Sequence, residues 1–264
     1  MSIEAVIFDW AGTTIDYGSR APLLAFQQTF AQYDIALSDA EIRRDMGLDK
    51  RQHIRQLLKD PQVAQTLQAA YPQLATNELI EALFTQFKRH LQMILPQTAQ
   101  LKPGVAELIA FLEANHIPYG STSGYDADMI AQLLPLVKAQ GYAPQVNVTS
   151  AQTQGVGRPD PAMNRLAMQQ LGVRDPARVL IIGDTVNDVL AAQNAGANAV
   201  GIIEGANLLA MSQAQWAALN DRQKAEAKTR VRGQYAAAGA DVIVSCASDL
   251  IQLIRQEADL EVAR

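Results

Sequence analysis

The sequence predicts an α/β protein in which helices cover both faces of a doubly wound, mostly parallel sheet, with an all-helical insertion. Two observations predict this class. Short apolar runs, most of them rich in Val or Ile, recur along the chain and alternate with helical stretches, a pattern typical of buried parallel strands joined by crossover helices. Residues 20–98 interrupt this alternation, because helical signals follow one another there without a convincing strand.

The expected strands are short and the expected helices lie between them. The strands are predicted at residues 5–8, 117–120, 146–148, 179–182, 199–203 and 242–244. Helices are predicted at residues 104–114, 126–138, 161–171 and 187–195. The Ala- and Gln-rich segment 204–240 is expected to be helical and to join the last two strands. Such a sheet binds ligands at the carboxyl ends of its strands.

The interval 20–98 is predicted to be a separate helical domain, inserted into a core made of residues 1–19 and 99–264. Pro22 can open a first helix, and Ser38 with Glu41 three residues later forms a capping box. Thr76 is expected to cap a long helix that ends near Pro96. Apolar residues repeat at steps of three and four along this last helix, which indicates a packing face.

Composition narrows the class of protein. The chain of 264 residues is 48% hydrophobic and 19% charged, unlike disordered chains, and its single cysteine excludes an internal disulfide. The net charge of −5, with no basic cluster, argues against nucleic-acid binding. We find no run of about 18 apolar residues and no secretory signal, so no membrane association and a cytoplasmic location are expected. Cys246 is interpreted as a residue of the core.

Polar and charged residues follow several of the predicted strands. Asp9 follows the first, Ser123 and Gly124 the second, Arg158 lies after the third, and Asp184 with Asp188 follows the fourth. Each aspartate alone could simply cap the next helix. Together they would repel one another unless a cation joined them, and oxygen ligands suit Mg²⁺ completed by water and phosphate. The sequence therefore predicts a magnesium-dependent site for a phosphoryl group.

These motifs resemble those of the haloacid dehalogenase superfamily. The segments Asp9-Trp10-Ala11-Gly12-Thr13, Ser123, Arg158 and Gly183-Asp184-Thr185-Val186-Asn187-Asp188 match its four motifs in order. Within the superfamily, Met46-Gly47-Leu48-Asp49-Lys50, together with Ser121-Thr122-Ser123-Gly124-Tyr125, is similar to the phosphonoacetaldehyde hydrolase (phosphonatase) family over nearly the whole chain. The resemblance implies a Rossmann-like core, a mobile helical cap and a homodimer.

The resemblance also implies roles for individual residues. Asp9 would be the nucleophile and Lys50 the amine that forms an imine with the substrate. Mg²⁺ would be held by Asp9, Asp184 and the backbone carbonyl of Ala11, with Asp188 supporting it through water. Ser123, Gly124 and Arg158 would hold the phosphoryl group. The resemblance leads us to expect threonine in many relatives where this chain has Ser123, which would keep the hydroxyl and lose the methyl group.

The chemical requirements of phosphorus–carbon bond cleavage are consistent with the same reaction. Cleavage of a phosphorus–carbon bond leaves a carbanion, which departs poorly unless an electron sink adjoins it. An iminium between Lys50 and an aldehyde would supply that sink while Asp9 captures the phosphoryl group. The expected reaction converts phosphonoacetaldehyde into acetaldehyde and phosphate.

For four residues, spacing alone does not exclude a purely structural role. Lys50 and His53 could be ordinary surface residues of one helix, whereas in the functional interpretation His53 orients the substrate or moves protons. Met46 either desolvates the Lys50 amine or packs in a core, and Tyr125 either borders the site or is structural.

Two other functions share the core motifs. A magnesium-dependent phosphate-monoester phosphatase of the same superfamily usually carries a second aspartate two residues after the nucleophile, where this chain has Ala11. A regulatory protein that only binds phosphorylated metabolites would not need the retained Asp9, Asp184 and Arg158.

Overall fold

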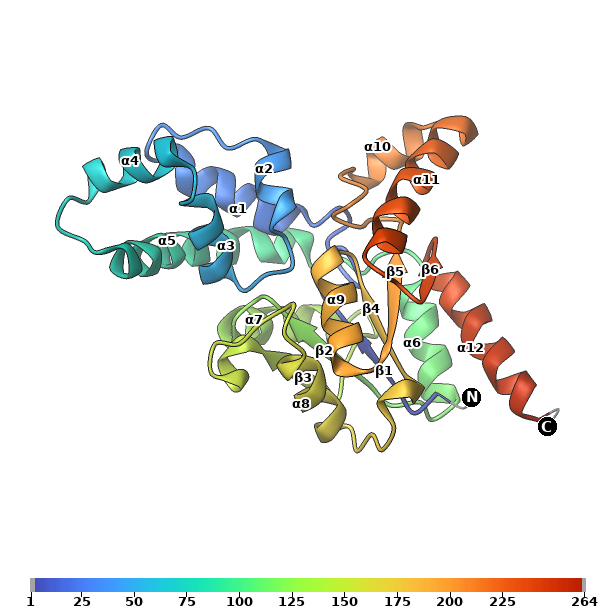
Figure 1. Cartoon of the computed structure of the whole chain (residues 1–264). Coiled ribbons are helices and arrows are strands. Elements are labelled where there is room, and N and C mark those ends of the chain that lie inside the picture. Colours follow the sequence, from blue (N-terminus) through green and yellow to red (C-terminus); the bar gives the residue numbers. More distant parts are fainter. Residues whose placement is uncertain (1–2, 263–264) are drawn as a thin grey trace.

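The computed structural model, which describes residues 3–262, contains a six-stranded sheet in which every neighbouring pair is parallel (Figure 1). The strand order is β3-β2-β1-β4-β5-β6. The strands are β1 (Ala5–Phe8), β2 (Tyr119–Ser123), β3 (Val146–Thr149), β4 (Val179–Gly183), β5 (Asn198–Ile202) and β6 (Val242–Val244). The prediction of a parallel α/β sheet is confirmed.

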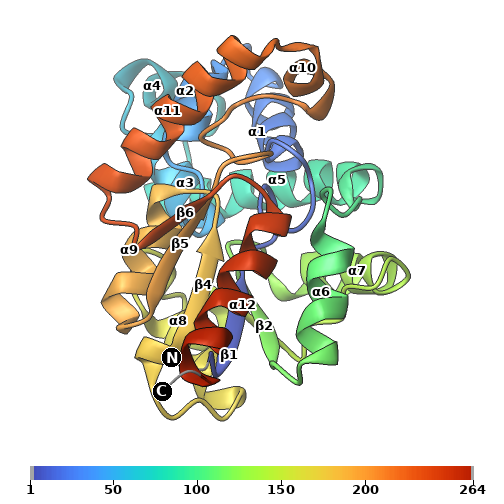
Figure 2. The ribbon, with the colours of Figure 1, turned by 90° about the vertical axis from the view of Figure 1, so that its right-hand side faces the viewer.

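Helices cover both faces of the sheet, as the alternation of side chains along β1 requires. Val6 and Phe8 lie in one apolar cluster with residues of α6 (Val105–Ala114), α7 (Ala127–Lys138) and α12 (Ala247–Val262). Ala5 and Ile7 lie in a second cluster on the opposite face. That cluster includes residues of α8 (Ala162–Gln170), α9 (Val186–Ala195), α10 (Gln213–Ala218) and α11 (Asp221–Ala237). Figure 2 shows α6 and α12 in front of the sheet.

Five of the helices between β1 and β2 project to one side of the sheet (Figure 1). They are α1 (Arg20–Ala31), α2 (Asp39–Arg44), α3 (Lys50–Leu57), α4 (Pro61–Ala70) and α5 (Thr76–Thr98). We call this segment the helical module. The described residues 20–98 contain no strand. The capping box is confirmed, because the Ser38 hydroxyl accepts from the Glu41 N–H and the Glu41 carboxylate accepts from the Ser38 N–H.

The structure corrects both ends of the long helix α5. Thr76 is its first residue and not its cap, because Ala75 holds the cap position and donates its N–H to the Glu78 carboxylate at 2.9 Å. The helix also continues past Pro96 to Thr98. Proline has no N–H for the carbonyl four residues earlier, and here that carbonyl, of Gln92, accepts from the Gln132 side chain of α7 at 2.9 Å.

Other boundaries differ by one or two residues. Strand β2 begins at Tyr119 rather than residue 117 and extends to Ser123, so Ser123 ends the strand instead of following it. The segment 204–240 is helical only in α10 and α11, and residues 204–212 form a loop after β5. Two 3-10 helices, η1 (Ser150–Thr153) and η2 (Pro176–Arg178), complete the connections. Within residues 3–262, the helices are too short or too polar to cross a membrane.

Candidate active site

The candidate site lies where the carboxyl ends of the central strands meet the helical module. Asp9 directly follows β1, Ser123 ends β2, and Asp184 directly follows β4. Because β1 pairs with both β2 and β4, these three residues reach the same edge of the parallel sheet. The sequence-based placement of the site at this edge is therefore reproduced by the structure.

A small cavity of about 20 Å³ lies between this edge and the helical module. Nine of the eleven predicted site residues line it: Asp9, Ala11, Met46, Lys50, Ser123, Gly124, Tyr125, Arg158 and Asp184. A volume of this size holds about one water molecule. The helical module thus leaves little free space over the site in this structure.

The predicted nucleophile, Asp9, is held by an arginine. Arg158 donates to the Asp9 carboxylate at 2.6 Å and pairs with the Asp188 carboxylate at 2.8 Å. Its second nitrogen donates to the Thr122 carbonyl at 2.8 Å and to the Thr122 hydroxyl at 2.7 Å. Burial raises the pKa of Asp9 to about 6, against the opposing effect of the Arg158 charge. This arrangement fixes the Oδ1 atom of Asp9, a residue that lines the cavity.

Asp188 does not line the cavity. Its carboxylate pairs with Arg158 and accepts from the Thr185 N–H at 3.0 Å at the start of α9. In the structure, Asp188 thus orients Arg158 and contributes to the cap of α9. A water-mediated contact with a metal stays a prediction.

Lys50 is the first residue of α3, and its side chain enters the cavity from the helical module. The residue is only 4% exposed, so the interpretation as a surface lysine is wrong. Burial lowers the pKa of Lys50 to about 8, although the carboxylates of Asp9 and Asp49 act in the opposite direction. Desolvation of this kind favours the neutral amine that attacks a carbonyl. The Lys50 amine also lies 5.9 Å from the centre of the Tyr125 ring.

His53 is buried on α3 but does not line the cavity. Its ring packs against Phe26 of α1, with 4.2 Å between the ring centres. Burial, with a contribution from the Lys50 charge, holds the pKa of His53 well below its usual range. The interpretation as a surface histidine is therefore wrong, whereas direct contact with a substrate stays a prediction.

Met46 and Tyr125 are buried and form part of the cavity wall. The Met46 carbonyl accepts from the Asn187 side chain of α9 at 2.9 Å, which attaches the segment before α3 to the core. Met46 also belongs to the large apolar cluster. Met46 therefore packs in a core, whereas desolvation of the Lys50 amine by Met46 stays a prediction.

The residues proposed for Mg²⁺ provide oxygen atoms in a crowded, buried setting. Burial and the neighbouring charges of Asp9 and Asp188 raise the pKa of Asp184 well above its usual range. A cation would offset this repulsion. Among the side chains that the structure describes, no three acidic, His or Cys groups form a metal site by themselves. The predicted ligand set combines the two carboxylates with the Ala11 carbonyl, and it stays a prediction.

The turn after Asp9 leaves no room for a side chain beside Asp184. Gly12 has a φ of +84°, and a Cβ there would lie 2.0 Å from the Asp184 Oδ2 atom. The Ala11 carbonyl accepts from the Ser19 hydroxyl at 2.9 Å. Asp184 accepts from the Asn207 N–H at 2.7 Å. The hard oxygen donors and the close approach of backbone and carboxylate fit a small divalent cation.

Several residues at the site were not predicted. Ser19, Pro22, Gly47 and Thr185 also line the cavity. Gly47 and Thr185 lie within motifs that the sequence analysis quoted, so their proximity could have been expected. Nothing local to Ser19 indicates its role, because its contacts with Ala11 and Asp184 depend on the path of the chain after β1.

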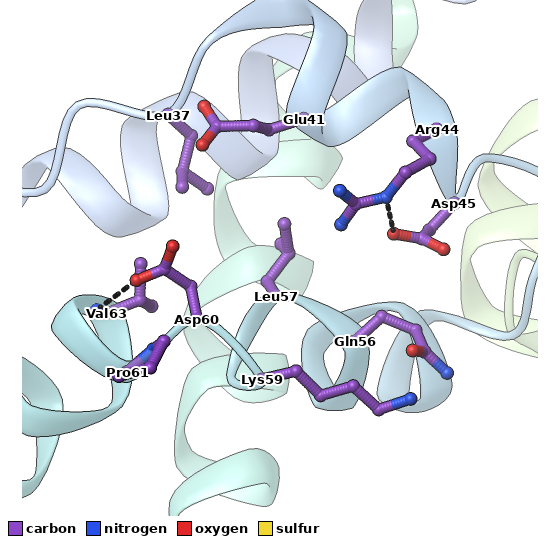
Figure 3. Close-up of a pocket in the computed structure, with 10 residues that line it drawn as sticks. All are labelled: Leu37, Glu41, Arg44, Asp45, Gln56, Leu57, Lys59, Asp60, Pro61 and Val63. Carbon is purple, nitrogen blue, oxygen red and sulfur yellow. Dashed lines mark hydrogen bonds and ion pairs between the residues drawn. The ribbon is translucent and has the colours of Figure 1, made fainter.

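A larger cavity of about 440 Å³ lies within the helical module, between α2 and the segment joining α3 to α4 (Figure 3). Its charged side chains include Glu41, Lys59 and Asp60, and Arg44 pairs with Asp45 across 3.1 Å. None of the predicted site residues lines this cavity. Size alone therefore does not identify the site, and the small cavity at the sheet edge carries the reactive groups.

Comparison with known proteins agrees with this geometry. A family model described as haloacid dehalogenase-like hydrolase matches residues 3–196. The chain is 49% identical over 256 residues to a phosphonoacetaldehyde hydrolase from Lactiplantibacillus plantarum, with 97% of each chain covered. It is 37% identical to one from Hahella chejuensis, with 94% of this chain and 84% of that protein covered.

A solved structure shows the same arrangement over nearly the whole length. The crystal structure of a phosphonoacetaldehyde hydrolase-like protein from Oleispira antarctica superposes with a TM-score of 0.90 at 32% identity, covering 97% of this chain and 92% of the other. By sequence and by fold, this chain therefore belongs to the phosphonoacetaldehyde hydrolase family of the haloacid dehalogenase-like hydrolases.

Proposed function

We propose that this protein hydrolyses the phosphorus–carbon bond of phosphonoacetaldehyde and releases acetaldehyde and phosphate. One observation carries the proposal: a buried lysine, Lys50, enters the same cavity as the carboxylate of Asp9. Cleavage of a phosphate ester needs no such amine, whereas cleavage of a phosphorus–carbon bond needs an electron sink beside the departing carbon. The names of the relatives support the same substrate.

The first half of the reaction uses Lys50. Its neutral amine attacks the aldehyde carbon, and loss of one water molecule gives an imine, whose nitrogen takes up a proton from solvent. The Asp9 carboxylate then attacks phosphorus in line with the phosphorus–carbon bond. The electron pair of that bond moves toward the iminium nitrogen, which leaves an enamine on Lys50 and a phosphoryl group on Asp9.

The second half restores both residues. Protonation of the enamine carbon gives an imine, and one water molecule hydrolyses it to acetaldehyde and the free Lys50 amine. A second water molecule hydrolyses the phosphoryl-aspartate to phosphate and the Asp9 carboxylate. Ser123, Gly124 and Arg158 line the cavity and are proposed to hold the phosphoryl oxygens during both steps.

Magnesium is the proposed cofactor, with Asp9, Asp184 and the Ala11 carbonyl as its ligands. The ion would supply positive charge that offsets the phosphoryl oxygens and the buried carboxylates. We further propose that residues 20–98 form a cap domain that opens to admit substrate and closes to place Lys50 near Asp9. A homodimer and a cytoplasmic location belong to the same proposal.

Phosphate-monoester hydrolysis is the second candidate, because the phosphoryl-binding part of the site would serve it equally well. The observation against it is Ala11, which lies in the cavity where a second carboxylic acid would protonate a leaving alcohol. A binding protein without activity is disfavoured by the retained Asp9, Arg158 and Asp184 and by the hydrolase relatives.

Trapping of the imine tests the proposal. Borohydride added with phosphonoacetaldehyde should inactivate the protein and add a two-carbon or phosphonoethyl mass to Lys50. Lys50→Arg keeps the positive charge but cannot form an imine, so it should abolish turnover and trapping. The matched control is Lys59→Arg, at an exposed position of the helical module, which should behave like the wild type. Substantial turnover by Lys50→Arg, or a trapped mass on another lysine, would contradict the mechanism.

A further inference from the structure

A hydrogen bond between the core and the helical module ends directly beside Lys50. The Ser150 hydroxyl, at the start of η1, donates to the Asp49 Oδ2 atom at 2.6 Å. The other carboxylate oxygen of Asp49 caps α3, where it accepts from the Arg51 N–H at 2.9 Å. A single side chain therefore joins the N-terminus of the lysine-bearing helix to a loop of the core.

The same segment rests closely on core backbone at two glycines. A Cβ on Gly124 would lie 2.8 Å from the Leu48 carbonyl oxygen, and one on Gly157 would lie 3.3 Å from the Asp49 Cβ atom. Because these glycines leave no space for a side chain beside the segment before Lys50, the segment packs closely on the core and has little freedom while the hydrogen bond is intact.

Asp49 and Ser150 also form part of the wall of a cleft of about 510 Å³ outside the active-site cavity. Gly124 lines both spaces. The outer cleft is large enough for a small phosphonate, whereas the inner cavity of about 20 Å³ is not. The Ser150–Asp49 contact thus lies beside the boundary between an accessible space and the reacting groups.

We propose that Ser150 is a positioning residue for Lys50: its hydrogen bond to Asp49 docks the N-terminus of α3 on the core, and its release lets substrate pass from the outer cleft to Asp9. The kinetic consequence of this docking rests on the proposed function, whereas the docking itself does not. Ser150 touches no reacting atom and acts only through Asp49.

A double-mutant cycle tests the coupling. Ser150→Ala removes the donor, and Asp49→Ser keeps a good helix cap but is too short to reach Ser150. Each single variant should lower kcat/KM for phosphonoacetaldehyde by about tenfold, since the hydrogen bond has a charged acceptor. The double variant should lose no more than either single one. Asp49→Asn should restore most of the activity lost in Asp49→Ser, because its side-chain oxygen keeps the cap and its amide NH2 group can donate to the Ser150 hydroxyl. Losses that multiply, or no loss in Ser150→Ala, would overturn the proposal.

Amide hydrogen exchange tests the docking without any reaction. Ser150→Ala should speed exchange in α3. The matched control is Asp60→Ser, because Asp60 caps α4 through the Gln62 N–H at 2.8 Å and has the same helix-capping role away from the core. This control should leave exchange in α3 unchanged. Unaltered exchange in Ser150→Ala would overturn the proposal. If the wild type were inactive on phosphonoacetaldehyde while Ser150→Ala still showed faster exchange in α3, only the proposed function would be refuted.

Discussion

Burial, only partly offset by neighbouring charges, shifts the pKa values of single side chains at this site. Asp9 and Lys50 are both almost completely buried, and burial is the largest influence on the pKa of each. Arg158 moderates the effect at Asp9, because it donates directly to that carboxylate. The two groups consequently approach each other in pKa, about 6 for Asp9 and about 8 for Lys50. An anionic nucleophile and a neutral amine can thus coexist near pH 8.

The rate of imine formation should rise with pH through about 8. The neutral form of Lys50 is the reactive one, and its burial lowers the pKa from 10.5 to about 8. The facing charges of Asp9, Asp49 and Asp184 oppose this shift, and Arg158 adds to it. Below the pKa the neutral fraction falls about tenfold for each pH unit. Trapping with cyanoborohydride between pH 6 and 10, followed by mass spectrometry, measures the profile. A midpoint near 10.5 would show that Lys50 is not desolvated in solution.

Ala11 should decide which phosphorus compounds are hydrolysed. An alkoxide leaving group needs a proton, and a positioned general acid contributes about 10² to 10⁴ in rate, but Ala11 offers none. The enamine route avoids this demand, so the wild type should hydrolyse phosphate monoesters poorly. Ala11→Asp should depress cleavage of phosphonoacetaldehyde, because it adds bulk and negative charge beside Asp9. The measurement is kcat/KM for phosphonoacetaldehyde and for several monoesters in the wild type and in Ala11→Asp. Ala11→Ser is the control, because serine is polar but uncharged and close to alanine in size. A wild type that prefers monoesters would favour the phosphatase function.

At the scale of elements, α5 of the helical module is joined to α7 of the core at the point where proline interrupts its hydrogen bonding. Gln132→Ala should lower the free energy of unfolding by about 1 kcal/mol, because it leaves the Gln92 carbonyl without its donor. In a Pro96→Ala background, the backbone N–H of residue 96 can replace that donor. Gln132→Ala should therefore lower the free energy of unfolding by less than it does in the wild type. Urea unfolding of the four proteins measures the coupling. Equal costs in both backgrounds would show that the contact does not compensate for Pro96.

The elements that the sequence predicted well are those with a local signal. Apolar runs such as Ala5–Phe8 and the capping box of Ser38 with Glu41 depend on neighbours in the chain, and both are confirmed. The end of α5 was not predictable, because proline normally stops a helix and its compensation comes from Gln132, 36 residues after Pro96 in sequence. The extent of β2 was likewise missed, since the polar Ser121 and Thr122 carry no apolar signal and form strand through pairing with β1 and β3, which are distant in sequence.

The candidate site was predictable to the extent that motifs specify it. Resemblance supplied Asp9, Lys50 and Asp184, and the structure brings all three to one cavity. Burial of Lys50 could not be derived from its neighbours, because several arginines around it suggest an exposed helix face. It results from the docking of α3 on a core that is distant in sequence, as the contact of Asp49 with Ser150 shows.

At the scale of the whole molecule, the reactive groups are divided between two parts that meet only in the folded chain. The core supplies Asp9, Arg158 and Asp184, and the helical module supplies Lys50. Apolar residues from both parts form one continuous buried cluster, which includes Phe26 and Leu91 of the module and Phe8 of β1. Ligands that bind at the junction should therefore stabilise the molecule as a unit.

Removal of the metal should be visible in thermal stability as well as in activity. Mg²⁺ with inorganic phosphate should raise the Tm of the wild type above its value in EDTA, since a ligand at 100 times its Kd adds about 2.7 kcal/mol. Asp184→Asn should lose this response. Its metal-free Tm should be no lower than that of the wild type, because the substitution removes a buried charge repelled by Asp9 and Asp188. Asp221→Asn, at an exposed position on α11, is the matched control and should respond like the wild type. If Asp184→Asn kept the full response to Mg²⁺, the ion would be bound elsewhere, and the ligand set of Asp9, Asp184 and the Ala11 carbonyl would be wrong.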